Sequence, residues 1–147
     1  DERIKEIIQN SDVLFPSIYI FYNNVNFSLE NKSYLEENTK EVIRIGKKYN
    51  KPVYPMIMSR YHPSNSKIGN ELIEKDNIKF YINTILETRY NGKAIDGLML
   101  WNADGYAHRI KEKKITAELS TTKMNFEQYY DQHLIEVLNI MLRNNKK

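Results

Sequence analysis

Three short stretches of the sequence combine aromatic and polar side chains at the ends of apolar runs. They are residues 19–22 (YIFY), 59–62 (SRYH) and 101–106 (WNADGY). A tyrosine offers an apolar ring with a hydroxyl that donates or accepts a hydrogen bond, and an indole offers a broad face. These stretches are the strongest sequence indication of a binding site. The alternative for Tyr19 and Trp101 is that their rings only pack beneath helices.

Asp104 and His108 could form an acid–base pair, with the carboxylate next to the imidazole. Both lie in or beside NADGY, however, whose residues are also typical of a turn, and we favour the turn. His62, His108 and His133 show no metal-ligand spacing, and the sequence contains no cysteine. We therefore expect neither a metal site nor a cofactor.

Strands and helices alternate along the predicted chain. Apolar runs predict three strands, at residues 13–21, 52–61 and 94–101. Helix-spaced apolar residues predict four helices, at residues 1–9, 34–49, 73–90 and 126–143. This order favours parallel strands joined by right-handed crossovers, with ligands bound beyond the carboxyl ends of the strands, where the three aromatic stretches lie.

Polar segments join these elements. Residues 62–69 and 102–114 are predicted loops, and residues 23–33 are long for a simple connection and thus a candidate functional loop. The predicted strand at residues 13–21 also carries Pro16, which cannot donate to a sheet ladder. None of these segments has the character of a linker between domains. We therefore expect a single α/β domain over residues 1–147.

Composition excludes several classes of protein. The net charge is +3, and Lys and Glu alternate along the 34–49 helix, so a nucleic-acid-binding stripe is not expected. No apolar run approaches the roughly 20 residues that span a bilayer, so we expect no membrane span. The chain begins at Asp1 instead of Met, which suggests processing from something longer.

The stretches LFPSIYI, KPVYPMIMSRY and DGLMLWNADGY resemble three successive late strands of the hyaluronidase family, the venom and sperm type of glycoside hydrolase. The resemblance covers roughly residues 11–104. It implies a distorted, TIM-like (β/α) barrel, in which the proline of the first strand accompanies a bend. Because such a barrel typically needs about 250 residues, three parallel strands alternating with helices would form only the C-terminal portion of a larger barrel.

The resemblance also implies an activity. Family members are retaining endo-N-acetylhexosaminidases that cleave hyaluronan, and often chondroitin, with the substrate's own acetamido oxygen as nucleophile and a glutamate as acid. Tyr19 matches the catalytic tyrosine that orients the acetamido group, and Trp101 matches the tryptophan that lines the groove. Arg60 and Tyr61 are expected to contact the polyanion or its acetyl group. Asp104 completes the substrate-binding candidates.

The sequence departs from the family in ways that limit this expectation. The acid motif Asp-x-Glu is absent, as are the cysteines of the family's disulfides. Catalysis would therefore need an N-terminal segment or a second polypeptide that carries the acid. Family membership implies a secreted or luminal glycoprotein, and two sequons, at Asn26 and Asn31, are present.

Two readings without glycosidase activity remain open. The chain could be a non-catalytic α/β structural or binding subunit that associates with a partner chain covering its open sheet edges. A flavodoxin-like domain that binds a phosphate ligand is disfavoured, because no glycine-rich turn joins a strand to a helix.

Overall fold

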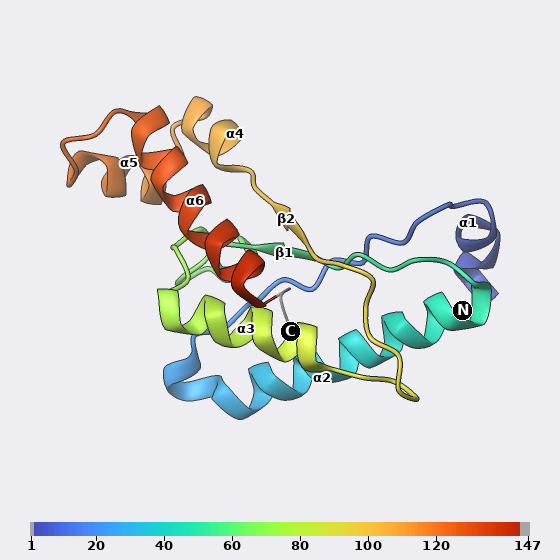
Figure 1. The fold of residues 1–147 in the computed structure, drawn as a ribbon. Helices are drawn as coiled ribbons and strands as arrows, with labels where there is room; N and C mark the ends of the chain where they lie inside the picture. The colour runs from blue at the N-terminus through green and yellow to red at the C-terminus, as the bar shows by residue number, and fades with distance from the viewer. Residues whose placement is uncertain (1, 145–147) are drawn as a thin grey trace.

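The computed structural model describes residues 2–144, which form a mostly helical α/β fold (Figure 1). Its elements in chain order are η1 (Glu2–Ile4), α1 (Lys5–Gln9), α2 (Asn24–Tyr49), β1 (Met56–Met58), α3 (Lys75–Glu87), β2 (Met99–Trp101), α4 (Asp104–Arg109), α5 (Lys113–Ser120) and α6 (Phe126–Asn144). The alternation of strands and helices confirms the α/β class predicted from the sequence.

The sheet is parallel, as predicted, but small. β1 and β2 pair with Met56 opposite Met99 and Met58 opposite Trp101. Residues 2–144 contain two regular strands of three residues each, and these do not form a barrel. Pro55 is one reason that β1 begins late, because a proline next to the ladder has no N–H to donate.

The first predicted strand, residues 13–21, is an extended segment that runs beside β1 without becoming a regular strand. Parallel bridges join Leu14 to Val53 and Ser17 to Met56. Leu14 N donates to Pro52 O at 2.9 Å, and Ile18 N donates to Met56 O at 2.9 Å. Pro16 lies between these two donors and has none of its own, so the ladder is interrupted at its middle.

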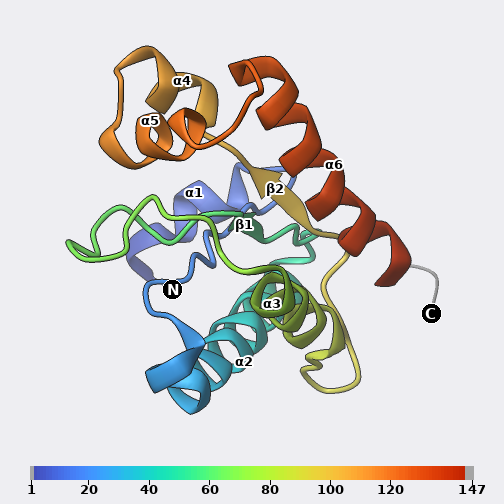
Figure 2. The same ribbon diagram turned by 90° about the vertical axis from the view of Figure 1, so that its left-hand side faces the viewer.

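Helices α2, α3 and α6 lie on one side of the sheet, with α3 in contact with both of the others (Figures 1 and 2). Between these helices and the sheet is the core, which includes Ile18, Ile20, Leu35, Ile57, Tyr81, Ile82, Ile85, Val137 and Met141. Alternate residues of an extended segment point to opposite faces. Ile18 and Ile57 therefore face the helices, whereas Met99 and Trp101, 38% and 50% exposed, lie on the other, uncovered face.

The predicted loop at residues 23–33 is wrong, because α2 begins at Asn24. A kink at Phe27, with φ −133° and ψ 29°, separates the first turn from the rest of the helix. The polar sequence of this stretch misled the prediction because Asn31 is buried, at 4% exposure. Its amide Nδ2 donates to Tyr22 O at 2.8 Å and to Asn24 Oδ1 at 2.9 Å, so a polar side chain occupies an interior position of the helix.

The loop predicted at residues 102–114 is wrong as well, because it contains α4 and the start of α5. The Glu112 side chain caps α5 by accepting from Lys114 N and Ile115 N. α3 is shorter than the predicted 73–90 helix, and α6 agrees with the predicted 126–143 helix. The predicted first helix corresponds to η1 and α1, while Asp1 is outside the described residues.

Candidate functional site

Tyr19 lies just before the carboxyl end of the extended segment, between two buried isoleucines, Ile18 and Ile20. Since those neighbours face the core, the Tyr19 ring lies on the opposite face and is half-buried. It stacks against His62, with ring centroids 5.8 Å apart and planes 20° apart. Within residues 2–144 the Tyr19 hydroxyl has no hydrogen-bond partner, so it is available to a ligand.

Trp101 ends β2 on the same uncovered side of the sheet as Tyr19. Its neighbour Leu100 packs against the core, while the indole is half exposed. β1 lies between the two backbone segments, so about two strand spacings, roughly 10 Å, separate them. The structure thus places Tyr19 and Trp101 on one face of the sheet, on either side of β1.

Arg60 and Asp104 are brought together, but in the interior. Their side chains are 3% and 4% exposed, and Arg60 Nε donates to Asp104 Oδ1 at 2.9 Å. The Arg60 guanidinium also donates to Glu118 Oε2 at 2.9 Å, to Asn70 O at 2.7 Å and to the Tyr129 hydroxyl at 3.0 Å. All of these contacts are within the protein, so both residues support the site's framework from inside.

The electrostatics of this cluster favour a permanently charged guanidinium. Burial opposes the charge on Arg60, but the carboxylates of Asp104 and Glu118 outweigh it, and the pKa of Arg60 is raised above its ordinary value. Burial, with a hydrogen bond to Glu118, raises the pKa of Tyr129 to about 12, so this phenol stays protonated and donates to the carboxylate. The cluster joins the end of β1 to α4, α5 and α6.

Tyr61 is also internal, at 1% exposure. Its hydroxyl donates to Glu74 Oε2 at 2.7 Å. Burial and then this hydrogen bond raise the Tyr61 pKa well above its ordinary value. Direct contact between Tyr61 and a sugar stays a prediction; in this structure the residue fixes the chain just before α3.

The possible acid–base pair of Asp104 and His108 does not form in the structure. Asp104 is the first residue of α4, and its carboxylate accepts from Arg60, while the His108 ring stacks on Phe126 at 4.0 Å. The backbone N–H of Asp104 donates to Asn102 Oδ1 at 2.7 Å. The favoured turn is wrong as well, because Asp104, Gly105 and Tyr106 form the first turn of α4.

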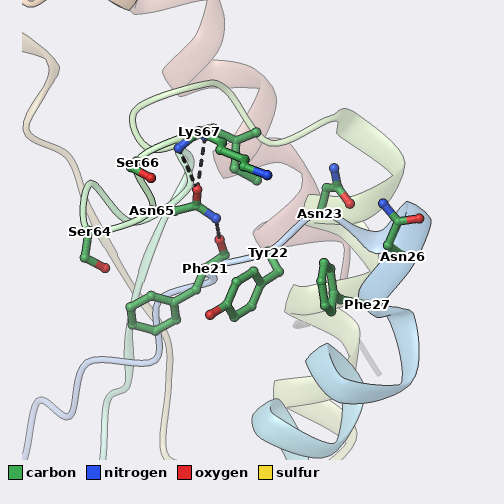
Figure 3. Close-up of a pocket in the computed structure, with 10 residues that line it drawn as sticks. Phe21, Tyr22, Asn23, Asn26, Phe27, Ser64, Asn65, Ser66 and Lys67 are labelled. Carbon is green, nitrogen blue, oxygen red and sulfur yellow. Dashed lines mark hydrogen bonds between the residues drawn. The ribbon is translucent and has the colours of Figure 1, made fainter.

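A pocket of about 450 Å³ opens beyond the end of the extended segment (Figure 3). One wall is the chain from Phe21 to Phe27, and the other is the loop that carries Ser64 to Lys67. We call this the amide–aromatic pocket, lined by Phe21, Tyr22, Asn23, Asn26, Phe27, Ser64, Asn65, Ser66, Lys67 and Ile68. Sequence reasoning pointed to Phe21 and Tyr22 through the stretch 19–22 and to His62 through the stretch 59–62, and it pointed to residues 23–33 and 62–69 as polar loops. It did not identify the individual residues of these two loops as site residues.

The comparisons with known proteins gave no relative. No family model matches the chain, and neither a curated protein nor a solved structure does. In residues 2–144, no helix is both long and apolar enough to cross a membrane. The same residues hold no group of three or more His, Asp or Glu side chains placed to bind a metal ion.

Proposed function

We propose that this chain is the C-terminal part of a hyaluronidase-like endo-N-acetylhexosaminidase and that it supplies one wall of the substrate cleft. The observation that carries the proposal is the placement of Tyr19 and Trp101 on the same uncovered face of the parallel sheet. An unbonded phenol and an exposed indole about two strand spacings apart suit a glycan that carries acetamido groups. The indole can stack on the C–H surface of a sugar while the phenol hydroxyl bonds the amide.

In the proposed reaction, Tyr19 orients the acetamido group so that its carbonyl oxygen attacks the anomeric carbon. The bond to the leaving sugar oxygen breaks as an acid, supplied by a segment with an Asp-x-Glu pair, protonates that oxygen. Water then opens the cyclic intermediate with net retention. The acid is not among the residues of this chain, so the proposal includes a companion N-terminal segment or polypeptide.

The uncovered face supports that companion. Parallel sheets are normally covered on both faces, and here α2, α3 and α6 cover only one (Figure 2). A barrel that continued on either side of the extended segment and β2 would enclose the other face together with Tyr19 and Trp101. We therefore include in the proposal that the chain is a portion of a (β/α) barrel.

The proposal places the protein in a secreted or luminal compartment and bears on the two sequons. Asn26 is exposed, whereas the Asn31 amide is buried and hydrogen-bonded. A glycan on Asn31 would replace donors that hold Tyr22 and Asn24. Asn26 lines the amide–aromatic pocket, so a glycan attached there would occupy that pocket, and we expect neither sequon to be used.

The test is hydrolysis of hyaluronan and chondroitin by the protein isolated with any segment that accompanies it, measured as release of reducing ends. Tyr19→Phe removes one hydrogen bond to the charged, reacting acetamido group and should lower kcat by roughly ten- to a hundred-fold. Absence of cleavage, together with unchanged glycan binding in Tyr19→Phe, would refute the proposal.

A second candidate is a non-catalytic subunit that associates with a partner chain. The same uncovered face, with Met99 and Trp101 exposed, favours it independently of any sugar. Mass measurement of the purified assembly detects an obligate second chain in either case. Glycan binding then separates the two candidates, since a purely structural subunit should bind no oligosaccharide.

A further inference from the structure

We propose that the amide–aromatic pocket is a second saccharide subsite, which holds a sugar unit of the same glycan next to the unit at Tyr19. The inference rests on the proposed function, because it takes the ligand to be an N-acetylated, uronate-containing glycan. It adds to the strand-end residues Phe21 and Tyr22 a set of loop residues that the strand-end motifs did not indicate.

The pocket presents two aromatic faces to solvent. Tyr22 is 50% exposed and Phe27 is 39% exposed, and their ring centroids lie 4.8 Å apart with planes at 37°. Exposed aromatic rings in a concave site offer apolar area at little cost in conformational entropy, since each ring has two torsions. The tilted pair forms a corner against which one sugar ring can pack.

The corner is held in place before any ligand arrives. Asn31 Nδ2 donates to Tyr22 O at 2.8 Å, and Asn65 Nδ2 donates to Phe21 O at 2.7 Å. Asn65 Oδ1 accepts from Lys67 N at 2.9 Å, which fixes the opposite wall to the same side chain. The kink at Phe27 turns that residue toward Tyr22 at the start of α2. A preorganised site loses less entropy on binding.

The polar rim fits hydroxyl and acetamido groups. Asn23, Asn26, Ser64 and Ser66 line the pocket with amides and hydroxyls, which both donate and accept (Figure 3). Lys67 is the one charged residue among the described residues lining the pocket. A single exposed ammonium matches one uronate carboxylate, whereas a phosphate-rich ligand would call for several cations or a backbone nest.

An aromatic path connects the pocket to Tyr19. The Phe21 ring lies 4.7 Å from the His62 ring, and His62 stacks on Tyr19 at 5.8 Å. The pocket and Tyr19 are thus linked through the rings of Phe21 and His62. A linear glycan that reaches both would bind more tightly than one that reaches Tyr19 alone.

The test compares hyaluronan tetrasaccharide and octasaccharide binding, measured by titration calorimetry on the protein with any accompanying segment. Tyr22→Ala/Phe27→Ala should weaken octasaccharide binding by roughly ten-fold while changing tetrasaccharide binding less. Phe15→Ala, which removes a 45%-exposed ring near the start of the extended segment, is the matched control and should leave both affinities unchanged. Tyr19→Ala should weaken both ligands.

The double variant could lose affinity because the pocket changes shape. Lys67→Gln tests the pocket without this effect, because the Lys67 side chain is exposed and its replacement should leave the packing intact. It should weaken hyaluronan octasaccharide binding and reduce its salt dependence, while leaving binding of uncharged N-acetylglucosamine oligomers unchanged. If Tyr19→Ala weakens binding but the pocket variants do not, the subsite is refuted and the proposed function stands. If the intact protein binds no oligosaccharide, the proposed function fails; preferential binding of a nucleoside would refute the saccharide subsite alone.

Discussion

Arg60 is a buried cation, and its burial is stable only because other groups of the protein pair with its charge. It contacts Asp104, Glu118, Tyr129 and the carbonyl of Asn70. Removing water from an ion pair costs free energy that the pair recovers only with good geometry, and removing one partner leaves an uncompensated charge. The cluster therefore stabilises the folded state, and it fixes the position of the chain at the end of β1, just before Tyr61.

Arg60→Met should lower the free energy of unfolding by about 3–5 kcal/mol, because Asp104 is left buried without its counter-ion. Urea denaturation followed by circular dichroism measures the change. Lys40→Met is the matched control: its ion pair with Glu37 is exposed, so its loss should change stability by about 0.5 kcal/mol or less. A loss below about 1 kcal/mol for Arg60→Met would contradict the structural role.

His133 should make stability depend on pH. Burial and the nearby Arg60 lower its pKa from the ordinary value of 6.5, although Asp104, Glu136 and Glu118 act in the opposite direction. The folded state therefore prefers the neutral ring, and the unfolded chain takes up the proton first as the pH falls through 6.5. Folding stability is complete above that pH and declines below it, down to the lowered pKa.

His133→Asn should flatten this decline, which urea midpoints at about pH 7.5 and about pH 5.5 measure. The wild type should lose more stability than the variant between these two pH values. Equal slopes in wild type and His133→Asn would show that the ring does not couple protonation to folding.

At the scale of elements, α2 is pressed closely against the segment that leads into β1. A Cβ added to Gly46 would lie 2.3 Å from Val53 Cγ2 and 2.9 Å from the carbonyl oxygen of Lys51. The absence of a side chain at Gly46 lets the last turn of α2 approach this backbone. A Cβ added to Gly105, in α4, would instead meet no atom within 4 Å.

Gly46→Ala should destabilise the fold by about 1–3 kcal/mol, because the helix or the segment must move apart. Gly105→Ala, the same change in an open helical position, should instead stabilise by about 0.5–1 kcal/mol. Thermal unfolding of the two variants measures both effects. Equal effects at the two positions would show that close packing does not limit Gly46.

Element types were easier to predict than their ends. The apolar periodicity of α3 and α6 identified both helices, while the polar first turns of α2 were missed because the buried Asn31 takes the place of an apolar core residue. Two of the three predicted strands contain β1 and β2, whereas the first, residues 13–21, makes only isolated bridges. Pro16 and Pro55 each lack an N–H donor, which shortens the ladders. The sequence shows where each proline is, but not which residue of the neighbouring strand lies opposite it. The hydrogen bond that each proline removes could therefore not be predicted.

The candidate site was predictable to a similar extent. Strand-end reasoning located Tyr19 and Trp101 on one face, because parallel strands share an edge. It could not separate them from Arg60, Tyr61 and Asp104, since burial at a strand's end depends on which helices return to cover it. α4, α5 and α6 supply that cover, and Glu118 and Tyr129 lie far from Arg60 in sequence.

On the scale of the whole molecule, helices cover one face of the parallel sheet and leave the other open. Met99 and Trp101 are exposed there, and no further strand within residues 2–144 pairs with the outer edge of β2. Exposed apolar area next to an open sheet edge favours association with another polypeptide. The proposed companion segment would cover this face and leave the ligand an opening at the strand ends.

Trp101 reports on that cover directly, because it is the one tryptophan of the sequence. In this chain alone the half-exposed indole should show red-shifted emission that acrylamide quenches readily. In the protein assembled with its companion, emission should shift to the blue and quenching should fall by about two-fold or more, since burial in a packed interface excludes the quencher. Phe126→Trp in a Trp101→Phe background provides the control, as its ring stacks on His108. If assembly leaves the quenching of Trp101 unchanged or changes both tryptophans equally, the open face is not where the companion binds.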